Sequence, residues 1–200
     1  MSLKDPFPRG RVAFFVTSNV HKFMEARPVL AEYGIAAALL RFKTLEIQDE
    51  NMENIAKTSA AEASRKCNLP VLVEDAGLFI KALNGFPGPY SHYVYQTIGT
   101  KGILKLMRDV GQRDAHFRSV VAFCDTDRSL KIFHGEAPGR IAEEERGSLG
   151  FGFDPVFEPS EAPGKTFAEM TLTEKGKYSH RAKALRKFAE WYASAFQRRF

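Results

Sequence analysis

The stretch RVAFFVTSNVHK, residues 11 to 22, passes abruptly from β-branched and aromatic residues to small polar ones. Val12 to Val16 predicts a buried strand, and residues 21–33 predict a helix that ends at Gly34. A strand that turns directly into a helix presents N–H groups and the positive end of the helix dipole, which suits a phosphate. Because the Walker sequence GxxxxGK[ST] is absent, an ordinary strand-to-helix turn remains the alternative.

Helices and strands alternate through the first half of the chain, and a hairpin follows. We expect Pro28 to kink or split the first helix. The order favours an α/β fold in which an elongated mixed sheet is flanked by helices, with residues 1–200 forming one domain of two inseparable lobes around a central cleft. The other predicted elements are strand 35–41, helix 52–67, short strand 71–73 closed by a turn at 74–77, strand 78–83, helix 101–108, hairpin strands 116–123 and 130–134, polar strand 140–145, loop 147–165 and a last helix from Ser179.

Composition narrows the class of protein. Hydrophobic residues make up 44% and charged residues 26% of the chain, which excludes a disordered polar segment. No apolar stretch of 18 residues occurs, so we expect no membrane span. Cys67 and Cys124 have no metal-binding spacing and predict buried free thiols, as in a cytoplasmic protein. The net charge of +5 favours anionic partners such as nucleotides, but interspersed acidic residues argue against nucleic acid.

Carboxylates mark one candidate site. Glu74 and Asp75 follow the buried run VLV, where ligands enter an open α/β sheet. Carboxylate oxygens suit Mg²⁺, although neighbouring residues of a strand point to opposite faces. A solvated turn is the alternative for this pair. Glu46 is a further carboxylate, for which an ordinary surface position is the alternative.

Two stretches late in the chain suit a purine base. In GFGFDP, residues 150 to 155, glycines bracket aromatic side chains that we expect to be exposed, and a flat base can stack on them. A loop that buries its own aromatic residues is the alternative. In SHR, residues 179 to 181, Ser179 is placed to cap a helix, so that His180 and Arg181 offer donors from its first turn. Unpartnered surface residues are the alternative there.

Together these stretches are specific. TSNVHK, VLVEDAGLFIKALNGFPGPYSHYV, GFGFDPVF, KTFAEMTLTEK and YSHRAKAL resemble the inosine-triphosphate pyrophosphatase family, most closely its archaeal-type branch, from about Val12 to the final helix. The resemblance implies hydrolysis of non-standard purine nucleoside triphosphates (ITP, dITP and XTP) to the monophosphate and pyrophosphate. It also implies an elongated, two-lobed α/β fold, a homodimer, Mg²⁺ as cofactor, and no nucleic-acid or membrane partner.

The resemblance also implies roles for individual residues. Glu46 and Asp75 would bind Mg²⁺, and Asp75 would take a proton from the attacking water. The triphosphate would be held by Thr17, Ser18, Asn19, Val20, His21 and Lys22. The rest of the substrate would contact Ala76, Phe151, Gly152, Phe153, Asp154, Lys175, His180 and Arg181.

This sequence departs from the family pattern at two substrate-facing positions. Ala76 replaces a serine of many relatives and removes a hydroxyl contact, and His92 replaces a lysine of some relatives. Two other functions stay open at this stage. A related hydrolase of modified pyrimidine nucleotides would lack the paired phenylalanines and the SHR donors, and a non-enzymatic nucleic-acid binder would show no triphosphate turnover.

Overall fold

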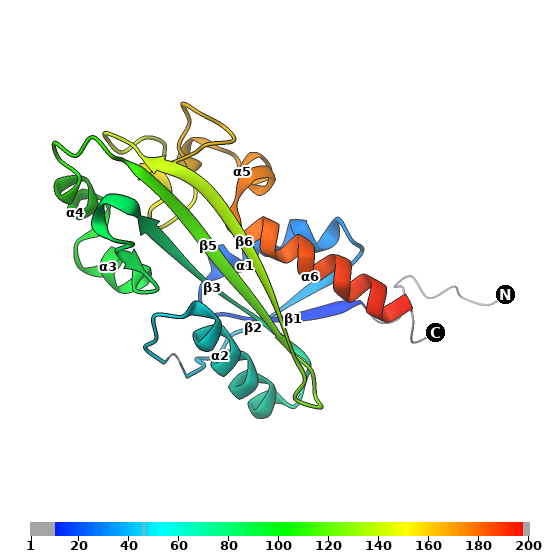
Figure 1. The fold of residues 1–200 in the computed structure, drawn as a ribbon. Helices are drawn as coiled ribbons and strands as arrows, with labels where there is room; N and C mark the ends of the chain where they lie inside the picture. The colour runs from blue at the N-terminus through cyan, green and yellow to red at the C-terminus, as the bar shows by residue number, and fades with distance from the viewer. Residues whose placement is uncertain (1–10, 46, 198–200) are drawn as a thin grey trace.

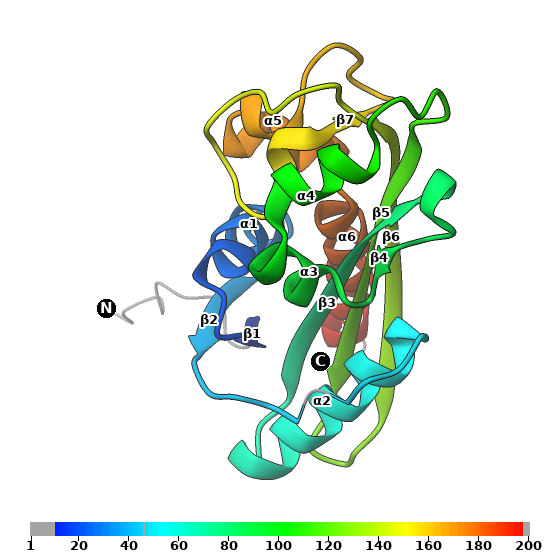
Figure 2. The ribbon, with the colours of Figure 1, turned by 90° about the vertical axis from the view of Figure 1, so that its left-hand side faces the viewer.

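One seven-stranded sheet organises the protein, as a computed structural model that describes residues 11–45 and 47–197 shows (Figures 1 and 2). The strand order is β2-β1-β3-β5-β6-β7, and β4 pairs separately with β3. The strands are β1 (Val12–Val16), β2 (Ala36–Leu40), β3 (Val71–Ile80), β4 (Pro87–Gly88), β5 (Asp114–Cys124), β6 (Leu130–Ile141) and β7 (Phe157–Pro159). The α-helices are α1 (Val20–Ala31), α2 (Met52–Cys67), α3 (Ser91–Thr97), α4 (Gly99–Leu106), α5 (Leu172–Tyr178) and α6 (His180–Gln197).

The sheet is mixed, as predicted. Strand β1 runs parallel to β2 and β3, whereas β3, β5, β6 and β7 pair antiparallel in sequence. The predicted α/β class and the central hairpin are therefore confirmed. The hairpin strands are longer than expected because β5 and β6 pair from Asp114↔Arg140 to Cys124↔Leu130.

Helices cover the two faces of the sheet separately. On one face, Phe15, Leu72 and Val121 pack in a buried cluster with residues of α1 and α6. On the other face, Val73 and Val120 pack with residues of α2. Figure 1 shows α6 and α2 on either side of the long strands. Alternate residues of β3 therefore belong to different layers of the protein.

One edge of β3 has an opening between two strand partners. Strand β1 pairs with β3 only at Val71 and Leu72, and β4 pairs with it at Leu78 and Phe79. Within the described residues, no strand pairs with residues 73–77 on this edge, which we call the open edge of β3. Side chains on both faces of β3 can approach a ligand there.

The predicted turn at residues 74–77 is wrong. Strand β3 continues without interruption from Val71 to Ile80, because β5 pairs with it along all ten residues. The expected separate strand 78–83 is the end of β3 followed by a 3-10 helix at Lys81–Leu83. Acidic residues and glycine indicated a turn locally, and the long antiparallel partner overrides that tendency.

Other differences are smaller. Helix α1 remains one helix with Pro28 inside it, so of the two expected outcomes, a kink or a split, the split is wrong. The prediction of a polar strand at residues 140–145 is wrong beyond Ile141, because β6 ends there. Helices α3 and α5 were not predicted, and each has only seven residues. The predicted loop 147–165 contains a 3-10 helix at Asp154–Val156 and strand β7.

Two compositional predictions can be compared with the structure. None of the helices within residues 11–45 and 47–197 has the length and apolar character that crossing a bilayer requires. Cys67 and Cys124 are both free thiols, as expected, although Cys67 is half-buried and only Cys124 is buried.

Candidate active site

The predicted phosphate turn lies between β1 and α1 and caps its own helix. The Asn19 side-chain oxygen accepts the N–H groups of His21 at 2.9 Å and Lys22 at 3.4 Å. The Thr17 hydroxyl accepts the Asn19 N–H at 3.1 Å. These N–H groups are therefore bonded to side chains of the turn itself. Asn19 is the N-cap of α1, and Ser18 and Val20 on either side of it are both exposed.

Lys22 turns from α1 towards the open edge of β3. Its ammonium group donates to the backbone carbonyl oxygen of Glu74 at 3.0 Å and lies 3.1 Å from the Glu74 carboxylate. The Glu74 side chain is completely buried and also accepts a hydrogen bond of 2.7 Å from the Ser119 hydroxyl. Burial opposes the charge of Glu74, yet Arg181 and Lys22 hold its pKa well below the ordinary value.

Arg181 lies on the other side of the same carboxylate. Ser179 caps α6, since its hydroxyl accepts the Ala182 N–H at 3.2 Å, which places Arg181 in the first turn as predicted. The Arg181 Nε atom lies 3.1 Å from Glu74, and Nη1 donates to Glu25 at 2.5 Å. The guanidinium group is thus held by two carboxylates, and these raise its pKa against the effect of burial.

A close approach of backbone to backbone fixes this first turn of α6. A Cβ atom on Gly135 of β6 would lie only 1.9 Å from the carbonyl oxygen of His180. The helix can rest this closely on the sheet only because residue 135 has no side chain.

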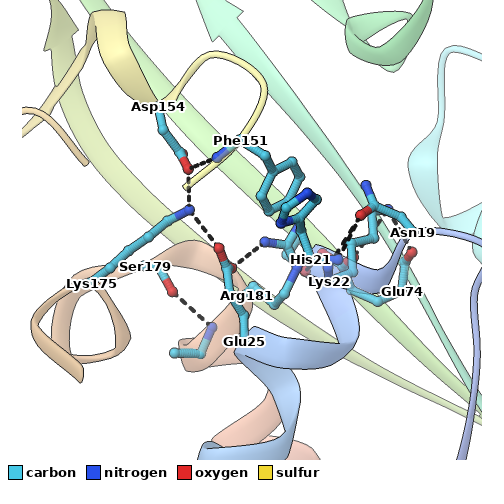
Figure 3. Close-up of polar contacts among 12 residues, drawn as sticks. Asn19, His21, Lys22, Glu25, Glu74, Phe151, Asp154, Lys175, Ser179 and Arg181 are labelled. Carbon is cyan, nitrogen blue, oxygen red and sulfur yellow. Dashed lines mark hydrogen bonds and ion pairs between the residues drawn. The ribbon is translucent and has the colours of Figure 1, made fainter. Parts of the chain in front are cut away.

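Lys175 extends the set of ion pairs to the GFGFDP loop. Its ammonium group lies 2.6 Å from Glu25 and 2.5 Å from Asp154, and its side chain is almost fully buried. Figure 3 shows the carboxylates and cations following one another across the site. We call this set the ion-pair chain; in order, it consists of Asp154, Lys175, Glu25, Arg181, Glu74 and Lys22.

Two carboxylates of the ion-pair chain, Glu25 and Asp154, differ in their electrostatics. Burial alone would raise the pKa of Glu25, but Arg181 and Lys175 lower it below the ordinary value. Burial and the neighbouring Glu25 carboxylate raise the pKa of Asp154 above the ordinary value, although Lys175 acts to lower it. Three acids and three bases alternate, so the buried charges compensate one another.

Phe151 provides a flat surface above the ion-pair chain. Its ring is stacked with the His21 ring at a centroid distance of 5.3 Å, and Lys175 and Arg181 lie 5.1 and 5.3 Å from its centroid. The Phe151 N–H donates to the Asp154 carboxylate at 2.8 Å. Gly150 allows this arrangement: its φ is +73°, and a Cβ there would lie 2.1 Å from the same carboxylate.

Two predicted substrate residues lie deeper than expected. Phe153 is 3% exposed and packs edge-on against Tyr95, so the expectation of an exposed aromatic side chain is wrong for Phe153, while Phe151 is half-buried. His180 is 2% exposed and stacks on Phe117 at 4.5 Å, and burial lowers its pKa well below the ordinary value. Gly152 is half-buried between the two phenylalanines.

Asp75 lies on the opposite face of β3 from Glu74. It is half-buried, at the open edge of β3, beside the half-buried Ala76. The other predicted metal ligand, Glu46, lies outside the described residues. Among the described residues no group of three or more His, Cys, Asp or Glu side chains is arranged to hold a metal ion.

Known proteins match this chain over most of its length. The model of the Ham1 family matches residues 13–191. The chain belongs to the Ham1 family. A dITP/XTP pyrophosphatase of Methanopyrus kandleri is 51% identical over 89% of this Ham1-family chain and 94% of its own length. Another, from Methanothermobacter marburgensis, is 46% identical over 92% and 97%. The resemblance to archaeal relatives is thereby confirmed.

Solved Ham1 structures share the fold. A HAM1 protein from Coxiella burnetii superposes with a TM-score of 0.80 at 27% identity, covering 92% of this chain and all of that one. The Ham1 protein of Staphylococcus aureus gives a TM-score of 0.75 at 25% identity, covering 92% of this chain and 99% of its own. The mixed sheet described above is thus the Ham1 architecture.

Sequence reasoning missed Glu25 and Ser119 as members of this Ham1 site. Glu25 lies on the buried side of α1, because it comes directly before the buried Ala26 and one helical turn before the buried Val29. A carboxylate among such residues signals a buried charge in need of a partner. Ser119 offers no such signal, because serine is common within strands that bury one face.

Proposed function

We propose that this chain hydrolyses non-standard purine nucleoside triphosphates, ITP, dITP and XTP, to the nucleoside monophosphate and pyrophosphate. One observation carries the proposal beyond family membership. The phosphate-turn cation Lys22 and the guanidinium group of Arg181, which lies under the Phe151 ring, meet at the single carboxylate of Glu74. Donors for a phosphate and a surface for a base therefore lie next to each other.

In the proposed reaction, Asp75 on one face of β3 acts on the attacking water, and Lys22 on the other side acts on the leaving group. Asp75 accepts a proton from a water molecule whose oxygen bonds to the α-phosphorus. The bond from that phosphorus to the bridging oxygen breaks, and pyrophosphate leaves. Lys22 stabilises the negative charge that develops on the leaving group.

Mg²⁺ is proposed as the cofactor, held by Asp75 and Glu46 together with phosphate oxygens. Carboxylate oxygens are ligands that a hard cation prefers, and Mg²⁺ usually combines one or two of them with oxygens of substrate phosphates. Bound there, the metal supplies charge neutralisation of the phosphate oxygens.

We assign the choice between purine bases to hydrogen-bond donors that lie against the Phe151 ring, above all to Arg181. A 6-oxopurine offers an acceptor to Arg181, whereas adenine offers an amino group that would face a donor. Lys175 and Asp154 hold the loop that carries Phe151, and His180 is buried against Phe117, where burial lowers its pKa. The buried carboxylate partners of Arg181 keep its guanidinium group in one place while a base binds.

Two further properties are part of the proposal. A homodimer is proposed from the family resemblance, and sedimentation of the purified protein measures its mass directly. A cytoplasmic location is proposed because Cys67 and Cys124 are free thiols, which suits a reducing compartment.

The test is a panel of nucleoside triphosphates with Mg²⁺, read as pyrophosphate released. We expect turnover of ITP, dITP and XTP well above that of ATP, GTP and modified pyrimidine triphosphates, and loss of turnover in EDTA. Reaction in ¹⁸O water should place the label in the monophosphate. Preferred turnover of a pyrimidine substrate, release of single phosphate, or salt-dependent duplex binding without turnover would each overturn the proposal.

A further inference from the structure

Glu74 is a buried charge that contacts no substrate in the proposed reaction and takes no part in its chemical steps. Its side chain has no exposure, and it lies in the middle of β3 on the face opposite Asp75. One carboxylate oxygen faces the Lys22 ammonium group at 3.1 Å. The other receives the Ser119 hydroxyl at 2.7 Å and lies 3.1 Å from Nε of Arg181. A single rigid group therefore contacts both the phosphate lysine and the base arginine.

The position of Glu74 makes these two cations dependent on each other. A buried carboxylate requires compensation by cations, and Lys22 and Arg181 share that task. When phosphate oxygens attract the Lys22 ammonium group, less of its charge compensates the Glu74 carboxylate. Compensation of Glu74 then rests more on Arg181. Arg181 is then held more firmly between Glu74 and Glu25, which favours an acceptor on the base.

We propose that Glu74 is a positioning residue that couples occupation of the phosphate site to recognition of the purine base. This inference rests on the proposed function in assigning Lys22 to phosphate and Arg181 to the base. Coupling of this kind is reciprocal, so each ligand strengthens the binding of the other by the same factor. The two carboxylates of the Glu74–Asp75 pair then have separate roles, one for cations of the protein and one for the metal.

The coupling can be measured without catalysis. Inosine, an uncharged probe of the base site, is titrated by calorimetry into the whole protein in Mg²⁺ buffer, with and without saturating inorganic pyrophosphate. We expect pyrophosphate to tighten inosine binding by at least about fivefold, the lower end of typical coupling factors. In Glu74→Gln, which keeps the shape of the side chain, we expect the factor to fall to about one.

Two variants serve as controls. Glu158→Gln removes a carboxylate of similar chemistry that pairs with Arg146 at 2.6 Å on β7, and the coupling factor should stay at its wild-type value. Ser119→Ala keeps the Glu74 charge and removes only its hydrogen bond, so it addresses the proposal even if Glu74→Gln does not fold. We expect it to lower the coupling factor about two- to threefold, the lower end of the effect of one hydrogen bond.

The possible outcomes separate this inference from the proposed function. Equal coupling factors in wild type, Glu74→Gln and Ser119→Ala, or no coupling in wild type, overturn the positioning role. Turnover of ITP by the wild type is scored in a separate assay. Coupling with no ITP turnover would leave Glu74 in its role and remove the pyrophosphatase assignment.

Discussion

Glu25 and Lys175 are 150 positions apart in the sequence, and their side chains form an ion pair of 2.6 Å in the interior of the protein. Glu25 comes from α1, the helix that begins at the phosphate turn, and Lys175 comes from α5, which also holds the loop of Asp154. The pair therefore fixes the start of the chain against its last third. Because both groups are buried, each depends on the other for compensation.

Removal of Glu25 should strongly destabilise the protein. Glu25→Ala leaves the Lys175 and Arg181 charges short of a partner, and we expect the free energy of unfolding to fall by about 3–5 kcal/mol, the typical effect of breaking a buried pair. Urea unfolding followed by circular dichroism measures it. Glu32→Ala is the matched control, because Glu32 pairs with Arg186 at the surface, where such pairs contribute about 0–1 kcal/mol. Similar losses in both variants would contradict a compensating role for Glu25.

Asp75 should be essential for turnover but not for folding. Asp75→Asn keeps the shape of the side chain and loses its charge and basicity. We expect kcat for ITP to fall by roughly 10²-fold or more, the scale for loss of a general base. Steady-state pyrophosphate release measures this, with the thermal unfolding curve as the check on folding. Turnover close to the wild-type value in a folded variant would exclude the role.

Arg181 should determine the preference for ITP over ATP. Sites that hydrogen-bond a substrate group reject analogues lacking it by up to about 10⁴-fold, so Arg181→Ala should lower kcat/KM for ITP far more than for ATP. The measurement is the ratio of the two kcat/KM values in wild type and variant. Arg186→Ala on the same helix, which breaks only the surface pair with Glu32 and one backbone contact, should keep the wild-type ratio. An unchanged ratio in Arg181→Ala removes Arg181 from base recognition.

His180 should make the protein less stable in mild acid. Burial lowers its pKa in the folded state below the unfolded value of about 6.5, so the unfolded chain binds the extra proton more readily. The stabilisation is present above about pH 6.5 and is lost as the pH falls towards the folded pKa, at up to about 1.4 kcal/mol per pH unit. Urea unfolding between pH 7 and pH 5 measures this slope.

His180→Gln provides the comparison, because the lowered pKa of His116 contributes in the same direction in both proteins. The difference in slope between wild type and variant belongs to residue 180. Parallel slopes would mean that His180 is protonated in the folded protein as easily as in the unfolded one.

Local signals predicted the beginning of the site well. The strand and helix around residues 12–31 and the Ser179 cap are indicated by apolar runs and capping residues that lie within a few positions of one another. The position of Glu74 depends on β5, whose Ser119 lies 45 residues further along, and its interpretation as part of a turn was wrong. No local pattern contains that information.

Neighbouring residues in the sequence also did not predict which side chains of the site are buried. Phe153 resembles Phe151 in its sequence surroundings, and only tertiary packing, against Tyr95 and a hydrophobic core cluster, distinguishes the buried ring from the half-buried one. Glu25 was missed for the same reason, since its partners Lys175 and Arg181 lie 150 and 156 residues away. The roles assigned to Glu46, Asp75 and the phosphate turn stay predictions.

The uninterrupted path of β3 through Glu74 and Asp75 limits how the length of this chain can vary. Inserting or deleting one residue between Val71 and Glu74 would turn Glu74 towards the α2 face and Asp75 towards Lys22 and Arg181, because side chains alternate along a strand. Both carboxylates would still be present in the sequence, each on the wrong face. Length changes in descendants of this chain should therefore accumulate in the β5–β6 connection at residues 125–129 and be absent from residues 71–75.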